Sequence, residues 1–243
     1  MPISRIFSIA LLLAYTGLSS AQAPMPSEES LERAFPKQPK FSPYVDRNFP
    51  TKVFWGDTHL HTGNSLDAGA FGARLTPDDA YKFAKGEQLT SSSGFKARLG
   101  QPLDFLVVAD HSDNMGFFPK LNSGDPDMLA DPTGQRWYDM IQEGGQTATA
   151  AAVEIIQSLT GNSFPEALYL APGTPGYRDA WEQTMDAAEK HNEPGNFTAF
   201  IGYEWTSTDG GFNLHRVVMY RDEKSKASMM EPYTTLPPWG SPD

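Results

Sequence analysis

The sequence contains no cysteine among its 243 residues. Disulfide bonds are therefore excluded, and so is a metal site built from thiolates. A Gly-x-Ser-x-Gly segment, the turn that carries the nucleophile in many serine hydrolases, is also missing. Any metal ion would have to be held by histidine and carboxylate side chains, and the sequence gives no sign of a serine or cysteine nucleophile.

Basic residues are scarce. Lysine and arginine together number 19, against 30 aspartates and glutamates, so the formal net charge is −11. An acidic protein is repelled by the phosphate backbone of nucleic acids and by the anionic surface of a membrane. We therefore expect neither to be a partner of this chain.

Long apolar runs are absent except near the N-terminus, at residues 6–18. This run is too short to span a bilayer comfortably, but it has the length of a signal-peptide core. Arg5 precedes it, and Ala21 and Ala23 are small residues that suit cleavage after Ala23. We expect residues 1–23 to be a signal peptide and the protein to be exported, periplasmic or secreted. An uncleaved membrane anchor is the alternative, whereas the lack of cysteine excludes a lipid anchor attached through an N-terminal cysteine.

Two regions are predicted to follow the leader. Residues 24–50 are rich in proline, serine and charge, which predicts an extended N-terminal arm. Residues 51–243 have enough length and apolar material for one domain with a core.

The pattern of this domain favours an α/β fold. The apolar run at residues 105–109 is typical of a strand buried on both faces, as in a parallel sheet. A helix start is marked by Thr76 as N-cap, followed by Pro77 and two aspartates. We predict strands over residues 52–57, 105–109, 197–203 and 214–220, helices over 77–85, 135–159 (broken near Gly144-Gly145) and 177–190, and a loop over 112–134.

The most informative segment is Asp57-Thr58-His59-Leu60-His61-Thr62. Side chains alternate along an extended chain, so His59 and His61 point the same way and can reach one metal ion. Imidazole is the commonest transition-metal ligand. A single His-x-His pair also arises by chance, so its weight depends on what accompanies it.

Further polar residues lie at the predicted strand ends. His111 and Glu204 directly follow predicted strands, His215 begins the last one, and Asp67 lies on the loop after His61. In parallel α/β folds, functional groups gather at the carboxyl ends of strands. Nitrogen and oxygen donors converging there suit Zn, Mn or Fe(II). Behind these ligands, Asp57 and Asp110 are expected to orient imidazoles or to bridge ions.

Each of these residues has a plainer interpretation. His215 alone could be structural, Glu204 a solvated acid and Asp67 a turn residue. His191 is interpreted as a surface residue at a helix end and receives no role. Arg216 is interpreted as a surface residue too, although its place beside His215 makes it the best candidate for an anion contact.

The C-terminal residues predict no regular element. Four prolines interrupt the last twelve residues, Pro232, Pro237, Pro238 and Pro242. Because no final helix or strand is predicted to close the fold, we expect the sequence to be a fragment of a longer reading frame. A naturally irregular tail is the alternative.

Together these residues resemble the PHP (polymerase and histidinol phosphatase) superfamily, and more closely the DUF3604 family of exported PHP-like proteins. The PHP motif Asp-x-His-x-His-Thr with a downstream Ser-x-Asp matches residues 57–62 and 65–67. An apolar strand ending in Asp-His matches residues 105–111, and a strand ending in Glu matches 200–204. With His215 on the following strand, the resemblance covers about residues 51–222.

The resemblance implies a distorted PHP-type (β/α) barrel, incomplete in this chain. From its position alone, we expect a helical insertion over about residues 120–195 to shape substrate specificity. The resemblance also implies two or three divalent ions (Zn, Mn or Fe) at the carboxyl ends of the strands. Further superfamily ligands, a later histidine and a final Asp-x-His strand, are not found after His215. The implied ligands are His59, His61, Asp67, His111, Glu204 and His215.

The implied function is metal-dependent hydrolysis of a small anionic phosphoester. The ions would lower the pKa of a bound water, and the resulting hydroxide would attack phosphorus. The same ligands would serve a sulfate ester, an amide or a lactone equally well. A metal-binding module without turnover is a further alternative for a chain of this length. The sequence leaves the metal, the substrate and the oligomeric state open.

Overall fold

A computed structural model describes residues 27, 29, 52–161, 163–207, 214–236, 238 and 240. The chain divides into two compact units, residues 1–51 and 52–243, and only the second is described here. The predicted signal peptide, residues 1–23, lies outside the described residues, as does the predicted arm apart from residues 27 and 29.

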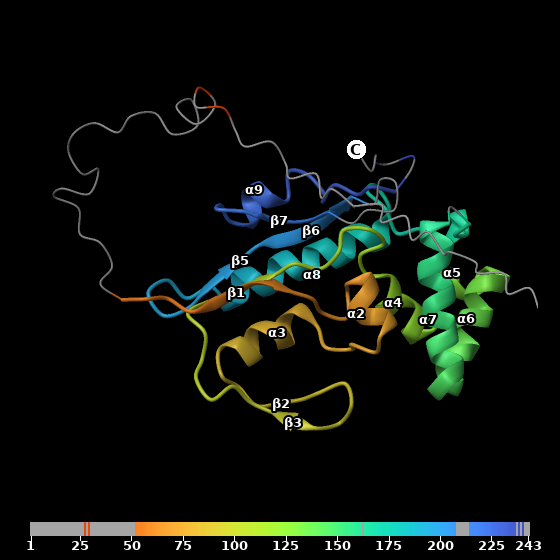
Figure 1. The fold of residues 1–243 in the computed structure, drawn as a ribbon, viewed down its shortest axis with the longest axis horizontal. Helices are drawn as coiled ribbons and strands as arrows, with labels where there is room; N and C mark the ends of the chain where they lie inside the picture. Colours follow the sequence, from red (N-terminus) through yellow and green to blue (C-terminus); the bar gives the residue numbers. More distant parts are fainter. Residues whose placement is uncertain are drawn as a thin grey trace, which may run out of the picture. The chain divides into compact units, whose positions relative to one another are not determined.

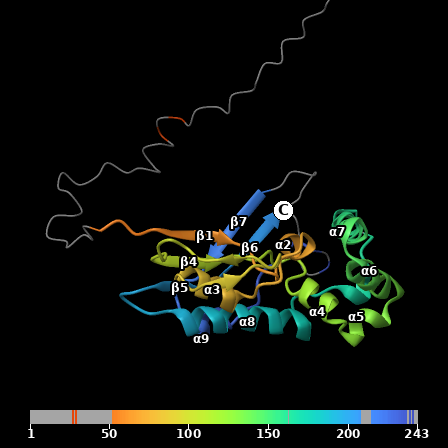
Figure 2. The same cartoon turned by 90° about the horizontal axis from the view of Figure 1, so that it is seen from below.

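The centre of the second unit is a three-stranded parallel sheet. Its strands are β1 (Gly56–Leu60), β4 (Phe105–Val108) and β5 (Thr198–Phe200), in the order β1-β4-β5. The middle strand carries the buried residues Leu106, Val107 and Val108, as the apolar run predicts for a strand covered on both faces. Figure 1 labels the two outer strands, and Figure 2 labels all three in this order.

Two helices that connect these strands pack against each other beside the sheet. They are α3 (Pro77–Ala84) and α8 (Pro175–His191), both close to their predicted bounds. The predicted start of α3 is confirmed by a capping box, in which Thr76 and Asp79 exchange hydrogen bonds between side chain and backbone. The hydroxyl of Tyr81 donates to the carbonyl of Phe200, 2.8 Å away, and so ties α3 to β5.

A two-stranded antiparallel sheet extends the molecule. It consists of β6 (Gly202–Ser207) and β7 (Leu214–Met219), with Thr206 opposite His215. The single strand predicted over residues 197–203 was wrong, because the chain bends at Ile201 into two strands. A Cβ atom at Gly202 would lie 2.5 Å from Val107, so only glycine allows this close passage beside β4.

Several helices lie between β4 and α8, in the region expected to be a helical insertion over about residues 120–195. These are α4 (Phe117–Ser123), α5 (Pro126–Ala130), α6 (Pro132–Glu143), α7 (Gly145–Thr160) and a short 3₁₀ helix, η1 (Glu166–Leu168). The loop predicted over residues 112–134 was wrong, because Asp125 and Asp131 cap helices whose first residues are prolines. Figure 2 shows α4 to α7 at one end of the sheet.

Four short elements complete the unit. These are α2 (Leu66–Ala70), α9 (Lys224–Ala227) and the hairpin strands β2 (Leu89–Thr90) and β3 (Lys96–Ala97). The hairpin was not predicted, since strands of two residues carry no readable periodicity. Figure 1 shows it next to α3, and β2 contacts that helix.

The α/β class is confirmed, but the expected barrel is not. Within the described residues the sheets do not close on each other, and the parallel sheet has only three strands. A barrel needs a continuous circle of paired strands, whereas β1 has a partner on one side only. In the same part of the chain, no helix is long and apolar enough to cross a membrane.

Candidate metal centre

The two histidines of the central motif lie at the end of β1. The strand runs from Gly56 to Leu60, later than the predicted 52–57, so His59 is inside it and His61 directly follows. Their rings lie on the same side with centroids 5.0 Å apart, as the alternation of a strand predicts. His59 is half exposed, whereas His61 is 16% exposed.

Glu204 is the centre of the cluster. It was predicted to follow a strand but lies inside β6, where its side chain is 0% exposed. Its Oε2 lies 3.0 Å from His59 Nε2 and 2.8 Å from His61 Nε2. Its Oε1 lies 2.8 Å from His215 Nδ1, and His111 Nδ1 is 3.4 Å from Oε2. One buried carboxylate therefore faces four imidazoles.

Asp67 closes the other side of the cluster from the first turn of α2. Its carboxylate lies 3.0 Å from His61 Nδ1 and 3.6 Å from His111 Nε2. Ser65 donates a hydrogen bond of 2.6 Å to Asp67 and accepts one of 3.1 Å from the backbone of His111. The six residues predicted as metal ligands are thus brought together by four strands and one short helix.

The cluster can hold a metal in three overlapping ways. In each of three groups the ligand atoms lie within 4.8 Å of one another. The groups are His59, His61 and Glu204; His61, Asp67 and His111; and His111, Glu204 and His215.

Unpaired polar atoms show that these residues fit a metal ion. His61 Nε2 and both carboxylate oxygens of Glu204 are buried without a hydrogen-bond partner. His61 Nε2 and Glu204 Oε2 lie at hydrogen-bond distance from each other, but the angles at these atoms do not suit a hydrogen bond. A buried carboxylate left unpaired is costly, whereas lone pairs that converge on one point are what a cation requires. Histidine nitrogen and carboxylate oxygen are also the donors that Zn, Mn and Fe(II) accept.

The ionised carboxylates of the cluster favour the binding of a positive charge. Burial alone would raise the pKa of Asp67, but hydrogen bonds from His61 and Ser65 lower it well below its usual range. Burial likewise opposes ionisation of Glu204, yet the surrounding histidines lower its pKa. Both carboxylates are therefore ionised at neutral pH.

The histidines differ from each other. Burial would lower the pKa of His61, but the hydrogen bond to Asp67 and the nearby carboxylates raise it. Burial lowers the pKa of His111, which is therefore neutral and able to bind a metal at pH 7. The negative charge that attracts a proton to His61 would equally attract a divalent cation.

The sequence model of the family described as "Protein of unknown function (DUF3604)" matches residues 48–238. The chain belongs to the DUF3604 family. No curated protein and no solved structure matches the chain. The matched range contains all six residues of the cluster.

The two aspartates expected behind the ligands of this DUF3604 protein hold backbone instead of imidazoles. Asp110 is buried and accepts hydrogen bonds from the backbone and the hydroxyl of Thr62, next to His61. Burial raises the pKa of Asp110 to about 6. Asp57 is exposed and accepts a hydrogen bond of 2.8 Å from the backbone of His59. Both fix the main chain that carries the two histidines.

Two hydroxyl residues of the site were not predicted from the sequence. Thr206 Oγ1 lies 2.9 Å from His111 Nδ1 and 3.1 Å from His215 Nδ1, and so links the last two histidines. Ser65 links Asp67 to His111, as described above. Ser65 belongs to the Ser-x-Asp motif of residues 65–67. No local sequence pattern marks Thr206, because only the register of β6 and β7 brings its hydroxyl to the imidazoles.

Two further residues of the DUF3604 chain lie differently from expectation. Arg216 pairs with Trp205 in the β6–β7 ladder, next to the pair formed by Thr206 and His215. Neighbouring residues of a strand point to opposite faces, so Arg216 does not share the face of His215. His191, predicted to be a surface residue, is buried and lies 2.8 Å from Asp78, because α8 packs against α3.

Proposed function

We propose that this protein is a metal-dependent hydrolase of phosphoesters in which water is the nucleophile. The observation that carries the proposal is the carboxylate of Glu204, which is fully buried and ionised and faces four imidazoles without a well-formed hydrogen bond. The resemblance of the motifs to the PHP superfamily agrees with it. Divalent ions in such a donor set supply Lewis acidity, which makes water a stronger nucleophile and stabilises negative charge on an ester oxygen.

The donor set favours two ions over three. A neutral imidazole has one acceptor nitrogen, so two groups that share a histidine compete for it. The first and third groups share no histidine: one has His59 and His61, the other His111 and His215. Glu204 belongs to both, and its two oxygens can serve one ion each.

The chain's own residues would orient these ligands. Asp67 accepts from Nδ1 of His61, which leaves Nε2, the unpaired atom, as the metal-binding nitrogen. Thr206 would hold the rings of His111 and His215 through their Nδ1 atoms. An acidic protein can still bind an anionic ester here, because bound cations would reverse the local charge.

The first test is the metal content of the purified protein, measured by elemental mass spectrometry after gel filtration. We expect about two equivalents of Zn, Mn or Fe per chain, and hydrolysis of chromogenic phosphate esters by the loaded protein. The variant Glu204→Gln should lose at least one equivalent and about a hundredfold or more in kcat/KM.

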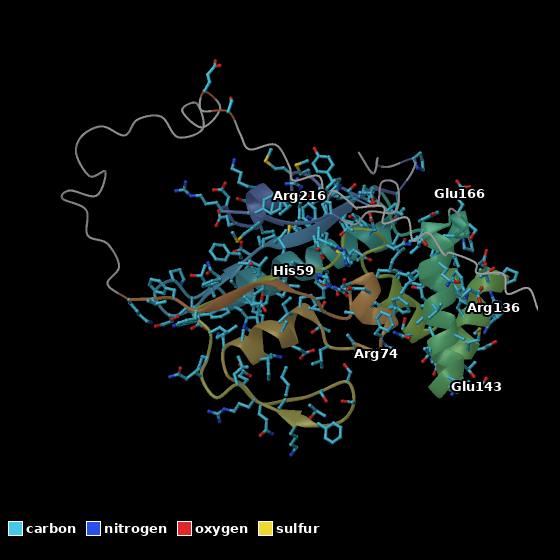
Figure 3. All side chains as sticks on the ribbon, viewed as in Figure 1. His59, Arg74, Arg136, Glu143, Glu166 and Arg216 are labelled. Carbon is cyan, nitrogen blue, oxygen red and sulfur yellow. The ribbon has the colours of Figure 1, made fainter. Side chains whose placement is uncertain are left out.

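The control variant is Glu143→Gln, which removes the same charge from an exposed position at the end of α6. Figure 3 shows Glu143 far from His59. Full metal content and activity in Glu204→Gln, or in the double variant His59→Ala/His61→Ala, would overturn the proposal. Turnover of sulfate esters or amides in place of phosphates would change the substrate class, and bound metal without any turnover would leave a metal-binding module.

We further propose that the protein is exported, on the strength of the leader-like residues 1–23. Sequencing the N-terminus of protein recovered from a periplasmic or culture fraction tests this. A chain that begins at residue 24 is expected, and an intact Met1 in the cytoplasm would contradict it.

A further inference from the structure

A cavity of about 250 Å³ adjoins the candidate metal centre on the side of α3. The end of β1, the segment before α3, α3 itself and the hairpin β2–β3 surround it. His61 belongs both to this wall and to the metal cluster. The cavity and the cluster are therefore separated by no more than one imidazole ring.

The wall of the cavity is apolar. Leu60, Leu75, Ala80, Phe83 and Leu89 contribute carbon, and the described residues that line it include no lysine, arginine, aspartate or glutamate. His61 contributes ring carbon as well, because both of its nitrogens lie against carboxylates. A charged group would find no counterion in this cavity.

Each hydroxyl group of the wall already has a hydrogen-bond partner within the protein. A ligand group that needs hydrogen bonds would therefore lose those it makes with water and gain few in return. The four pairs are Thr62 with Asp110, Thr76 with Asp79, Ser91 with the backbone of Phe95, and Ser92 with the backbone of Arg74.

The size of the cavity limits what it can accept. A dry apolar cavity of about 150 Å³ is known to bind benzene, so 250 Å³ suits one phenyl ring or a short branched alkyl group. Ala97 and Ser92 are exposed members of the wall and mark its opening to solvent. A group of this size can enter without unfolding the hairpin.

We propose that this cavity is the subsite for an apolar substituent of the substrate, an aryl or a short branched alkyl group. The inference rests on the proposed function, since it places the ester group at the metal cluster and the substituent beyond His61. The substrate class is then an ester of phosphate with one compact hydrophobic group, and not a sugar or nucleotide phosphate whose hydroxyls would need partners.

The test compares phenylphosphonate with methylphosphonate, two anions that share a headgroup and a bond the enzyme cannot hydrolyse. Affinities for the full chain loaded with Zn or Mn are measured by isothermal titration calorimetry. Phenylphosphonate is expected to bind about tenfold more tightly, because its ring leaves water. Equal affinities would overturn the proposal.

A matched pair of variants locates the effect. Ala97 faces the cavity opposite Leu89 in the hairpin, whereas Lys96 points to the other face. Ala97→Trp should remove the preference for phenylphosphonate and leave the affinity for methylphosphonate unchanged. Lys96→Trp should keep the tenfold preference. If Ala97→Trp does not fold, Leu89→Asn makes the wall polar and should reduce the preference instead.

A probe without an anionic group separates this proposal from the proposed function. Binding of fluorobenzene is followed by fluorine NMR in the metal-free protein, and we expect binding that Ala97→Trp abolishes. If fluorobenzene binds but neither phosphonate does, the phosphoester function is wrong. The cavity would then not be a subsite for a phosphate ester. If both phosphonates bind equally and fluorobenzene does not, the subsite is wrong and the phosphoester function stands.

Discussion

At the scale of single residues, the candidate site depends on a few buried polar atoms. Glu204 could not remain ionised and buried without positive charge nearby, and its only neighbours among the described residues that can supply it are histidines. The hydroxyls of Ser65 and Thr206 then fix how these rings are turned. Metal binding by these residues would therefore depend on which nitrogen of each imidazole is available to coordinate an ion.

Thr206→Val tests the role of the shared hydroxyl. Valine keeps the shape of threonine but cannot hydrogen-bond, so His111 and His215 lose their common partner. We expect metal affinity to fall by about 10- to 100-fold, as is usual when a group that orients a ligand is removed. The measurement is competition with a chelator, and Thr206→Ser should restore most of the affinity. Unchanged affinity in Thr206→Val would show that the rings are held by packing alone.

At the scale of elements, one aspartate joins the two helices that pack beside the sheet. Asp78, in the first turn of α3, contacts Lys82 on its own helix and Lys190 and His191 on α8. These contacts join the two helices that cover the sheet. Buried His191 is part of this junction, which explains why a residue that looked like a surface histidine is only 5% exposed.

Asp78→Asn tests this junction through its pH dependence. Hydrogen bonds from Lys190 and Lys82 lower the pKa of Asp78 well below its ordinary value of 3.8. A carboxyl group whose pKa is lower in the folded state stabilises the fold above its unfolded pKa and loses that effect as the pH falls. Since the side chain is 30% exposed, we expect the variant to be less stable by only about 1 kcal/mol at pH 7.

The difference between Asp78→Asn and the wild type should shrink below about pH 4. Urea unfolding at pH 7 and pH 3 measures it. Asp139→Asn, on the exposed face of α6, serves as the control and should change stability by less than about 0.5 kcal/mol at either pH. A difference that is the same at both pH values would mean that the contacts of Asp78 do not depend on its charge.

At the scale of the whole molecule, the cluster joins segments that are far apart in the sequence. His59 and His61 come from β1, His111 from the end of β4, and Glu204 and His215 from the β6–β7 sheet. Ions held by the group of His59, His61 and Glu204 and by the group of His111, Glu204 and His215 would each link the two sheets. Metal binding should therefore stabilise the fold as a whole and not only a loop.

The thermal stability of the protein should follow metal concentration. A ligand that binds only the folded state at 100 times its Kd adds about 2.7 kcal/mol. For a domain of this size, that raises the Tm by roughly 5–10 °C. Differential scanning calorimetry with Zn or Mn, and with a chelator, measures the shift. The double variant His59→Ala/His61→Ala should show a much smaller shift, and an equal shift would place the metal elsewhere.

The sequence by itself determined the α/β class, the helix start at Thr76 and the break near Gly144, because each depends on neighbouring residues. It also selected the six residues that cluster, since paired imidazoles and acids at strand ends leave a readable pattern. It missed the hairpin and the helices α4 and α5, which lie inside the predicted loop over residues 112–134.

Only the tertiary structure decided which atoms meet. Two facts follow from the pairing of β6 with β7 and with the end of β4: Glu204 is buried among four imidazoles, and Thr206 links two of them. Strand register is a property of residues distant in the chain, and a shift by one residue would move every side chain to the other face. Local sequence patterns do not contain that information.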